Sequence, residues 1–400
     1  MGLSRWPQYL PKAKASFYST WDWAQYSGEV VLIRADSGRP DTLLQDAVSA
    51  SYAADHLWFI RQGDLYAAPF DDESARIIGD PHLIRSDIRG TYRGQYVYSV
   101  ADNGTLVYAS SDDELVGAFW VDREGHESVI GLRGIKPDLG LSWPAISHDG
   151  TRVAFLKRTS VDWTMWIYDF NSDQEFQFTF GSDGIIGDFP IWSPDDQYIY
   201  YTNAISGVRN TYRRRSDATR RPESFVKLGW FLGSFSPDNE KVVYDRSNDI
   251  RIFTFSDSTD TVFIDGGSAR LTSPSFSPDG KWIVYLSNES GIYEVYVTDF
   301  LTGELKQRVS VNGGTEPLWS PTGRELFYKE GQRMMAVRYT SEPSFTPAPP
   351  EILFEDSFYF FPFTWTNYSV DLSGERFFVL KRIGGDTVQT IHVVQNALAN

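Results

Sequence analysis

Four aspartates recur in one kind of short turn and are the first residues to consider for chemistry. The clearest copy is the Ser-Pro-Asp-Gly stretch at residues 277–280. Carboxylates at matching positions could serve acid–base catalysis or hold a metal ion. Because each copy belongs to a different repeat, we expect the carboxylates to lie far apart and to accept backbone N–H groups of their own turns. We therefore predict structural turn residues at Asp149, Gly150, Asp195, Asp238, Asp279, Gly280, Gly323 and Gly374.

Other residues that could carry a reaction are scattered. The five histidines, at positions 56, 82, 126, 148 and 392, include no pair with metal-ligand spacing. The chain has no cysteine, which excludes disulfides and thiolate sites. It also lacks a Gly-x-Ser-x-Gly nucleophile elbow, a Gly-rich phosphate loop and the His-Arg-Asp and Asp-Phe-Gly motifs of kinases. The sequence therefore predicts no catalytic residue, no metal and no cofactor, and a chain that is not an enzyme.

The charge of the chain bears on its partners. Its formal net charge is −16, whereas nucleic acids and anionic membrane surfaces require a basic footprint. The arginine-rich stretch at residues 212–223 is predicted to be an outer hairpin whose charges block edge-to-edge pairing. No window has the apolar length of a membrane span or of a signal peptide. We expect either a soluble cytosolic chain or a piece of a longer protein.

The turns punctuate a repeated pattern of strands. After the turn at residues 277–280, the segment KWIVYL is aromatic and β-branched on both faces, which suits a strand covered on two sides. Turn residues recur at roughly 8–12 positions, and copies of the turn recur at about 41 to 51 residues. A period of this length with about four short strands is typical of β-propeller blades, and no segment has a convincing helical period.

We therefore predict an all-β chain that forms a single β-propeller domain over residues 1–400. The count favours nine four-stranded blades with a short last blade of three strands, and eight blades with one unit misread is the alternative. A propeller often closes by lending an N-terminal strand to its last blade, but only residues 1–5 precede the first unit. The predicted units are approximately residues 5–46, 47–92, 93–136, 137–186, 187–228, 229–268, 269–314, 315–358 and 359–400.

The turn and its aromatic-rich strand resemble the TolB-like propeller repeat. A second resemblance covers nearly the whole chain: segments 56–71, 287–300, 313–328 and 369–380 are similar, in the same order, to the propeller that follows the kinase domain in many bacterial membrane-anchored Ser/Thr protein kinases. This resemblance implies a propeller fold, an upstream transmembrane segment, an extracytoplasmic location and a sensor role. The fold alone implies no activity, because such folds host many functions.

The remaining candidate site is the mouth of the propeller, where the loops between second and third strands and the loops between blades share one face. Aromatic side chains at a concave mouth suit a peptide, glycan or protein partner. The alternative is that such aromatics plug the channel or pack between blades, which we favour for residues 358–363. The candidate binding residues are Trp21, Trp23, Tyr26, Arg158, Asp162, Trp163, Arg209 and Trp230.

Three functions remain as hypotheses. We favour a non-catalytic propeller that binds a ligand or protein as a sensor or scaffold, as the extracytoplasmic part of a bacterial signalling kinase. The first alternative is a propeller enzyme, a hydrolase or lyase acting on a polysaccharide, which a carboxylate pair about 5–10 Å apart at the mouth would favour. The second is a TolB-type periplasmic assembly protein. None of the three involves a nucleic acid or membrane insertion by this chain.

Overall fold

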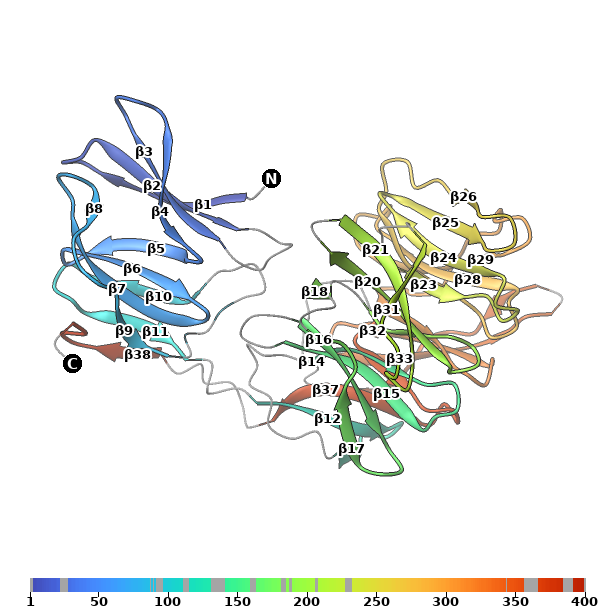
Figure 1. Cartoon of the computed structure of the whole chain (residues 1–400). Coiled ribbons are helices and arrows are strands. Elements are labelled where there is room, and N and C mark those ends of the chain that lie inside the picture. Colours follow the sequence, from blue (N-terminus) through green and yellow to red (C-terminus); the bar gives the residue numbers. More distant parts are fainter. Residues whose placement is uncertain are drawn as a thin grey trace.

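The computed structural model is built from β-strands joined by short turns (Figure 1). It describes residues 3–398 except 22–27, 87, 89, 91–95, 111–114, 131–140, 159–162, 181–184, 187–188, 206–207, 227–231, 343, 356–365 and 384–390. The strands form nine antiparallel sheets, mostly of four strands, so the predicted all-β architecture with nine blade-like sheets is confirmed. In the described part of the chain, no helical segment has the length and apolar character needed to cross a membrane.

Three of the sheets form one group, which we call the three-sheet group. The first sheet contains β1 (Leu3–Leu10), β2 (Ala15–Trp21), β3 (Glu29–Arg34) and β4 (Pro40–Gln45). The second contains β5 (Val48–Ala53), β6 (His56–Arg61), β7 (Asp64–Asp71), β8 (Arg76–Ile77) and β9 (His82–Arg85). The third contains β10 (Tyr98–Val100), β11 (Leu106–Ala109) and β38 (Ile391–Val394).

The other six sheets surround a common centre, and we call them the ring. Its closing sheet contains β12 (Leu115–Asp122), β13 (Glu127–Val129), β36 (Tyr368–Val370) and β37 (Arg376–Ile383). The next two sheets contain β14 (Leu141–Ile146), β15 (Arg152–Arg158), β16 (Trp163–Asp169) and β17 (Gln174–Gln177), and then β18 (Ile185–Ile186), β19 (Ile191–Trp192), β20 (Tyr198–Ile205), β21 (Val208–Arg215) and β22 (Glu223–Val226).

The last three ring sheets follow in chain order. They contain β23 (Leu232–Phe235), β24 (Lys241–Arg246), β25 (Asp249–Thr254) and β26 (Thr259–Ile264); β27 (Leu271–Phe276), β28 (Trp282–Ser287), β29 (Glu294–Asp299) and β30 (Gln307–Arg308); and β31 (Thr315–Trp319), β32 (Glu325–Glu330), β33 (Arg333–Thr340), β34 (Thr346–Pro347) and β35 (Glu351–Glu355). The second strand β28 is buried along its whole length, as expected for a strand covered on both faces, whereas the outer strand β26 is largely exposed.

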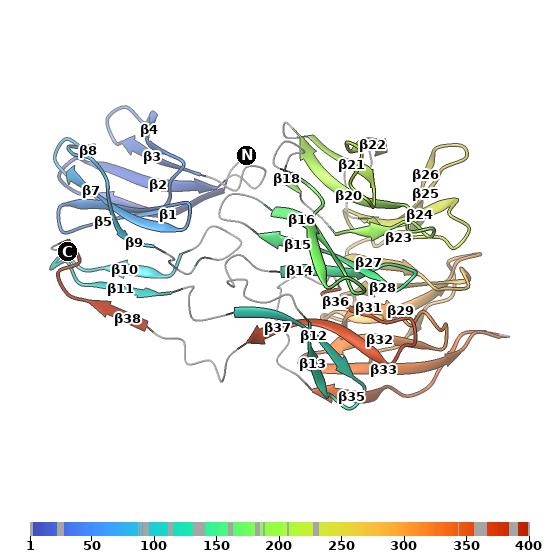
Figure 2. The ribbon, with the colours of Figure 1, turned by 60° about the horizontal axis from the view of Figure 1, so that its bottom comes forward.

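Buried apolar clusters show how the ring closes. Six clusters each join two neighbouring ring sheets, and every ring sheet takes part in two of them. In the three-sheet group, one cluster joins the first and second sheets and another joins the second and third. Both faces of each ring sheet are therefore covered, whereas the group is an open stack. Figures 1 and 2 show the two parts side by side.

The closing sheet is made from two distant parts of the chain. β12 pairs with β37 over eight residues, from Leu115 opposite Ile383 to Asp122 opposite Arg376, and β38 pairs instead with β11. The predicted units 93–136 and 359–400 therefore do not form one sheet each, because each contributes strands to two sheets. This exchange closes the ring with a sheet whose strands come from residues 115–129 and 368–383, and the number of sheets remains nine.

Candidate functional site

The innermost strands of the six ring sheets surround one cavity, which we call the channel. These strands are β14, β19, β23, β27, β31 and β36, and residues from all six line it. Its volume is about 720 Å³, which is in the usual range for a ligand site.

A bulge with a following proline shapes three of the inner strands. Trp143, Ser273 and Glu316 adopt left-handed backbone angles, with φ of 54°, 55° and 56°, and the strand register shifts at each. The next residue in each strand is a proline that lines the channel. Since proline has no N–H, the strand edge offers no donor there, and an edge that would otherwise recruit another strand is blocked.

The prolines have a fixed place relative to the turns. A channel-lining proline stands three residues before the turn serine in four ring sheets: Pro144, Pro190, Pro274 and Pro317. This Pro-x-x-Ser spacing is visible in the sequence, and it is the signal that would have identified the channel lining. The site predicted from the sequence lies in the mouth loops and does not include these prolines.

The turns at one end of the channel are held by their aspartates. The Ser277 hydroxyl donates to Oδ1 of Asp279 at 2.6 Å, and the same oxygen accepts the backbone N–H of Lys281 at 3.1 Å. Asp149, Asp195 and Asp238 have the same arrangement. At Asp238 the Ser236 hydroxyl, helped by the N–H of Glu240, holds the pKa of the carboxyl below its usual value. Each carboxylate is thus bonded within its own turn.

Neighbouring turns also contact one another around the channel. Gly280 has a φ of 71°, and a Cβ added there would lie 3.1 Å from Cδ of Pro237 in the preceding sheet's turn. Gly150 similarly faces Leu372 of the closing sheet, where a Cβ would lie 3.0 Å from a methyl carbon. Gly280 and Gly150 therefore serve both the turn conformation and the contact between sheets.

The described residues that line the channel are mainly apolar or carry hydroxyl groups. Among the described residues, those that line it include no Asp, Glu, Lys or Arg. Of the lining residues, His148 is the one histidine, and its Nδ1 lies 2.9 Å from Oδ1 of Asp196 in the next turn. Burial raises the pKa of Tyr368 well above its ordinary value, so this phenol stays neutral. Prolines, aliphatic and aromatic side chains and serine hydroxyls make up most of the surface.

Charged residues near the channel are engaged in joining sheets. Glu316 is 3.0 Å from the ammonium of Lys329 in an almost fully buried ion pair, and it accepts the backbone N–H of Asn367 at 2.7 Å. Asn367 in turn accepts the N–H of Trp143 in the next sheet at 2.8 Å. Burying an ion pair costs desolvation energy, which only well-aligned partners can offset. The Glu316–Lys329 pair and Asn367 therefore connect three neighbouring sheets.

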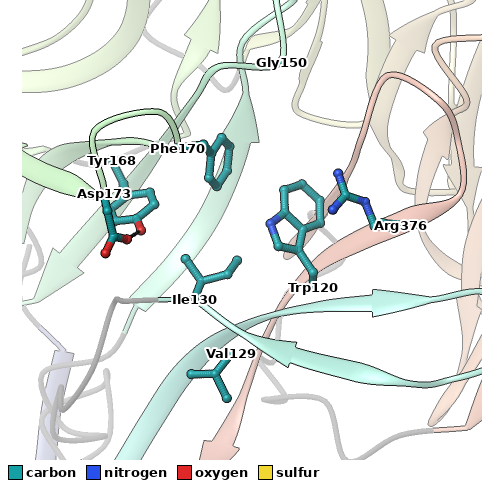
Figure 3. A pocket seen from close by; sticks show the side chains of 8 residues that line it. All are labelled: Trp120, Val129, Ile130, Gly150, Tyr168, Phe170, Asp173 and Arg376. Atoms are coloured by element: carbon teal, nitrogen blue, oxygen red, sulfur yellow. Dashed lines mark hydrogen bonds between the residues drawn. The ribbon is translucent and has the colours of Figure 1, made fainter.

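A second, smaller pocket of about 310 Å³ lies at the seam between the closing sheet and the sheet of β14–β17. Figure 3 shows Trp120 between Phe170 and Arg376, with Tyr168 and Asp173 beyond Phe170. The Arg376 guanidinium lies 4.8 Å from the Trp120 ring centre and donates to Asp371 at 2.9 Å. These contacts hold the seam together.

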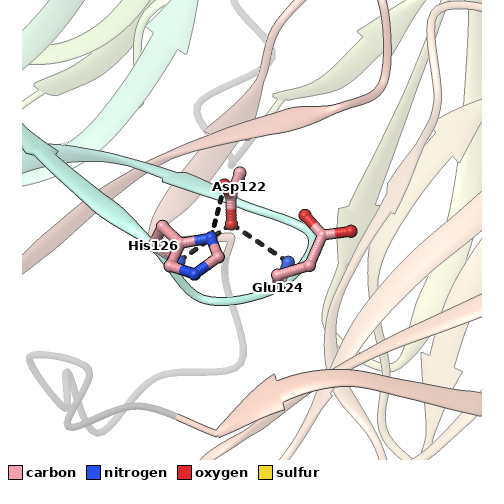
Figure 4. A group of neighbouring side chains, drawn as sticks. All are labelled: Asp122, Glu124 and His126. Atoms are coloured by element: carbon pink, nitrogen blue, oxygen red, sulfur yellow. Dashed lines mark hydrogen bonds and ion pairs between the residues drawn. The ribbon is translucent and has the colours of Figure 1, made fainter.

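One group of side chains in the described residues has the spacing of metal ligands. Asp122, Glu124 and His126 place one ligand atom each within 4.8 Å of one another at the β12–β13 hairpin (Figure 4). Glu124 and His126 are exposed, and Asp122 already accepts the N–H groups of both residues. Exposed acidic groups with internal partners are ordinary features of hairpin tips, so we assign no metal here.

Four of the eight predicted mouth residues lie within the described part of the chain. Trp23, Tyr26, Asp162 and Trp230 lie outside the described residues. The other four have described backbones: Trp21 ends β2, Arg158 ends β15 opposite Trp163 at the start of β16, and Arg209 is the second residue of β21. The β15–β16 and β20–β21 residues belong to the ring, whereas Trp21 belongs to the three-sheet group. The prediction that these side chains bind a partner stays a prediction.

The arginine-rich hairpin forms local pairs. Arg213 lies 3.2 Å from Glu223, and Arg215 lies 3.1 Å from Asp217. Arg214 donates to the backbone carbonyl of Phe178 at 2.6 Å. These arginines therefore stabilise β21 and its neighbours.

Comparisons with known proteins give partial likenesses. No family model matches the chain. An uncharacterized protein of Agrobacterium fabrum is 28% identical over 160 residues, which are 36% of this chain and 54% of that protein. The Tol-Pal system protein TolB of Wigglesworthia glossinidia brevipalpis is 32% identical over 87 residues, which are 21% of this chain and 20% of that protein. The chain thus matches about half of the first relative and a fifth of the second.

Solved structures give the fold. The structure of putative TolB from Agrobacterium tumefaciens has a TM-score of 0.53 at 16% identity, and the match covers 68% of this chain and 99% of that one. TolB from Acinetobacter baumannii has a TM-score of 0.44 at 14% identity, covering 83% of this chain and 78% of that one. The nine-sheet all-β architecture and the first of these likenesses together show that the chain has a TolB-like β-propeller fold.

Proposed function

We propose that this chain is a non-catalytic binding propeller whose ring channel takes an extended peptide segment of a protein partner. The observation that carries the proposal is the lining of the channel, where the described residues supply prolines, apolar side chains and hydroxyls but no acidic or basic group besides His148. Acid–base and metal-assisted reactions need such groups within hydrogen-bond reach of the substrate. A surface of this kind supports binding.

The lining also favours a peptide over a sugar. The channel-lining prolines have no N–H, and the backbone carbonyls of Ala145 and Ser275 already accept hydrogen bonds from the indoles of Trp192 and Trp319. An extended peptide would therefore contact the lining mainly through apolar side chains, against the half-buried Ile146, Ile191 and Leu318. Sugar sites, by contrast, usually hold hydroxyl groups with charged and amide side chains.

The test uses a peptide that is selected against the purified chain from a random library and then measured by calorimetry. Leu318→Arg places a charge in the channel, and it is expected to weaken binding at least about tenfold through lost apolar contact and blockage. Leu301→Arg is the matched control, because Leu301 is 92% exposed in a hairpin outside the channel. Equal binding by the chain and Leu318→Arg would overturn the channel as the site.

The finer part of the proposal is a sensor role in the extracytoplasmic half of a bacterial signalling kinase. It is supported by the similarity of segments 56–71, 287–300, 313–328 and 369–380 to the propellers of such kinases. Sequencing the natural reading frame tests it. A kinase domain and a membrane helix in the same frame would support the sensor role, and a frame without them would favour a TolB-type assembly protein.

The enzyme alternative has its own test. Turnover of oligogalacturonate or of a chromogenic peptide is expected to be absent from repurified chain. Turnover that persists through repurification and disappears in His148→Ala would contradict the non-catalytic proposal.

A further inference from the structure

In the three-sheet group, no other sheet of the described residues packs on the outer face of the first sheet or of the third sheet. Its second sheet is covered on both sides, but the first and third sheets each pack on one side. Apolar side chains stand on the open faces: Ile391 and Val393 of β38 are 66% and 63% exposed, and Tyr9 of β1 is 58% exposed. A stack of blades normally ends in a polar cap or closes on itself, so two apolar ends indicate a missing contact.

Neighbouring sheets pack in the same way in both parts of the chain. In the ring, the Ser234 hydroxyl on β23 accepts the backbone N–H of Phe276 on β27 at 2.8 Å. In the three-sheet group, the Gln8 side-chain oxygen on β1 accepts the backbone N–H of Tyr52 on β5 at 2.7 Å. The two pairs occupy equivalent positions near the ends of inner strands. Since six sheets packed in this way close the ring, three sheets correspond to half of one.

The open face of the third sheet matches a covered face of the ring. Ser99, Val107 and Val393 stand opposite one another across β10, β11 and β38. In the ring, the corresponding residues across β23, β24 and β25 are Ser234, Val243 and Ile252, and Ser234 accepts the hydrogen bond from Phe276. Those two side chains are 0% and 5% exposed because the next sheet covers them. The third sheet thus has the same arrangement of residues, but no sheet of the described residues packs on it.

The outer face of the first sheet resembles the ring-sheet face that packs on the preceding sheet. Tyr9, Ser16 and Ile33 stand opposite one another across β1, β2 and β3, and their side chains point away from the second sheet. In the ring, the row that packs on the preceding sheet begins with Phe276 and Ile283. Tyr9 therefore occupies the position of Phe276, the aromatic residue on which the preceding sheet of the ring packs.

We propose that two copies of the chain join through these faces and complete a second six-sheet ring. The third sheet of one copy packs on the first sheet of its partner, and two-fold symmetry repeats the contact. Ser99 of one copy then meets the backbone N–H of the partner's Tyr9, as Ser234 meets Phe276 within the ring. The occupant is a second copy because each end of the stack carries the surface that the other end requires, and two half rings close with no open face. This inference is independent of the proposed binding function.

Sedimentation velocity of the full chain over a concentration series tests the proposal. The expected mass is twice the chain mass of 45.5 kDa. Val393→Asp and Tyr9→Asp, both at exposed positions, are expected to shift the protein to the single-chain mass while the circular dichroism spectrum stays the same. Leu301→Asp is the matched control, since Leu301 is 92% exposed in the ring, and it should keep the two-chain mass.

Cysteine pairing identifies which faces meet, because the natural chain has no cysteine. Mild oxidation of a mixture of Ser99→Cys and Tyr9→Cys chains is expected to give disulfide-linked pairs, and neither variant alone should do so. Linked pairs from one variant alone would show that like faces meet and would overturn the arrangement. A single-chain mass at all concentrations, a two-chain mass that neither aspartate variant changes, or open-ended polymers would also overturn it.

Discussion

The ring and the three-sheet group are built from one repeat, but they differ in their turns. In the ring, the turns between first and second strands contact one another, as Gly280 does with Pro237. In the three-sheet group, the β5–β6 connection is a tight two-residue turn, Ala54 and Asp55, with φ of 52° and 57°. The strong Ser-Pro-Asp copies therefore occur where turns must fit together around a channel, and weaker copies suffice in an open stack.

The largest effect is expected at the closing sheet. Phe377 is fully buried against Phe327 and Phe354, with ring centres 4.9 and 5.5 Å away. Phe377→Ala should lower the free energy of unfolding by about 3–5 kcal/mol through lost packing and a cavity. Hydrogen exchange should show faster exchange in ring strands, with β1–β9 unchanged. Phe17→Ala, at an equally buried site of the three-sheet group, should give the reverse pattern, and identical patterns would contradict two separately packed parts.

Two glycines separate the cost of the turn from the cost of contact between sheets. Gly323 has a φ of 67° with nothing within 4 Å of an added Cβ, whereas an added Cβ at Gly280 would lie 3.1 Å from Pro237. Gly323→Ala should cost about 1 kcal/mol for the left-handed backbone. Gly280→Ala should cost about 1 kcal/mol more for crowding, measured by urea unfolding. Equal losses in the free energy of unfolding for the two variants would mean that neighbouring turns do not contact one another closely.

A smaller effect is expected at an ion pair between the closing sheet and the sheet of β31–β35. Arg123 of the closing sheet makes two 2.9 Å hydrogen bonds to Glu325 of β32, and both side chains are largely buried. Glu325→Gln should lower the free energy of unfolding by about 1 kcal/mol, since a charge-assisted pair becomes a neutral one. Glu342→Gln is the control, because its ion pair with Lys281 is mostly exposed and should contribute almost nothing.

The smallest effect is a pH dependence at the turns. The pKa of Asp238 is lowered in the folded chain by the Ser236 hydroxyl and the Glu240 N–H. The unfolded chain, whose carboxyl has a pKa of about 3.9, therefore takes up the proton first, so the stabilisation is present above about pH 4 and is lost as the pH falls through the lowered value. Urea midpoints measured from about pH 5 down to about pH 2 should fall less steeply for Asp238→Asn. An unchanged slope would contradict the assigned hydrogen bonds.

Much of the fold could be predicted from the sequence because each unit is local. The turns, the aromatic strands and the count of nine depend on residues close together in the chain. The pairing of β12 with β37 could not be predicted, because it joins residues 115–122 to residues 376–383. Nothing in the sequence of either strand specifies which strand it pairs with. Hydrophobic alternation specifies that a strand is covered, but not by which distant strand.

The candidate site could be predicted only in part. The sequence predicted structural turn residues at the aspartates, since an Asx turn is a local structure, and in the structure Asp279 accepts the backbone N–H of Lys281. The channel lining depends on which residue of each unit faces the centre, and the Pro-x-x-Ser spacing at Pro144, Pro190, Pro274 and Pro317 gains meaning only once the inner strands are known. The mouth residues were predicted from the loops in which they stand and, in part, from their aromatic side chains, and neither property specifies which side chains meet.

β12 and β37 share one sheet and close the ring of six. Zero-length carbodiimide cross-linking of the natural chain, followed by proteolysis and mass spectrometry, tests it without any substitution. Lys381 of β37 pairs with Glu127 of β13, and Lys157 pairs with Glu175 within the sheet of β14–β17, which provides an internal control. Cross-linked peptides that join Glu127 to Lys381 are expected. Recovery of the Lys157–Glu175 link with no Glu127–Lys381 link would contradict the closed ring.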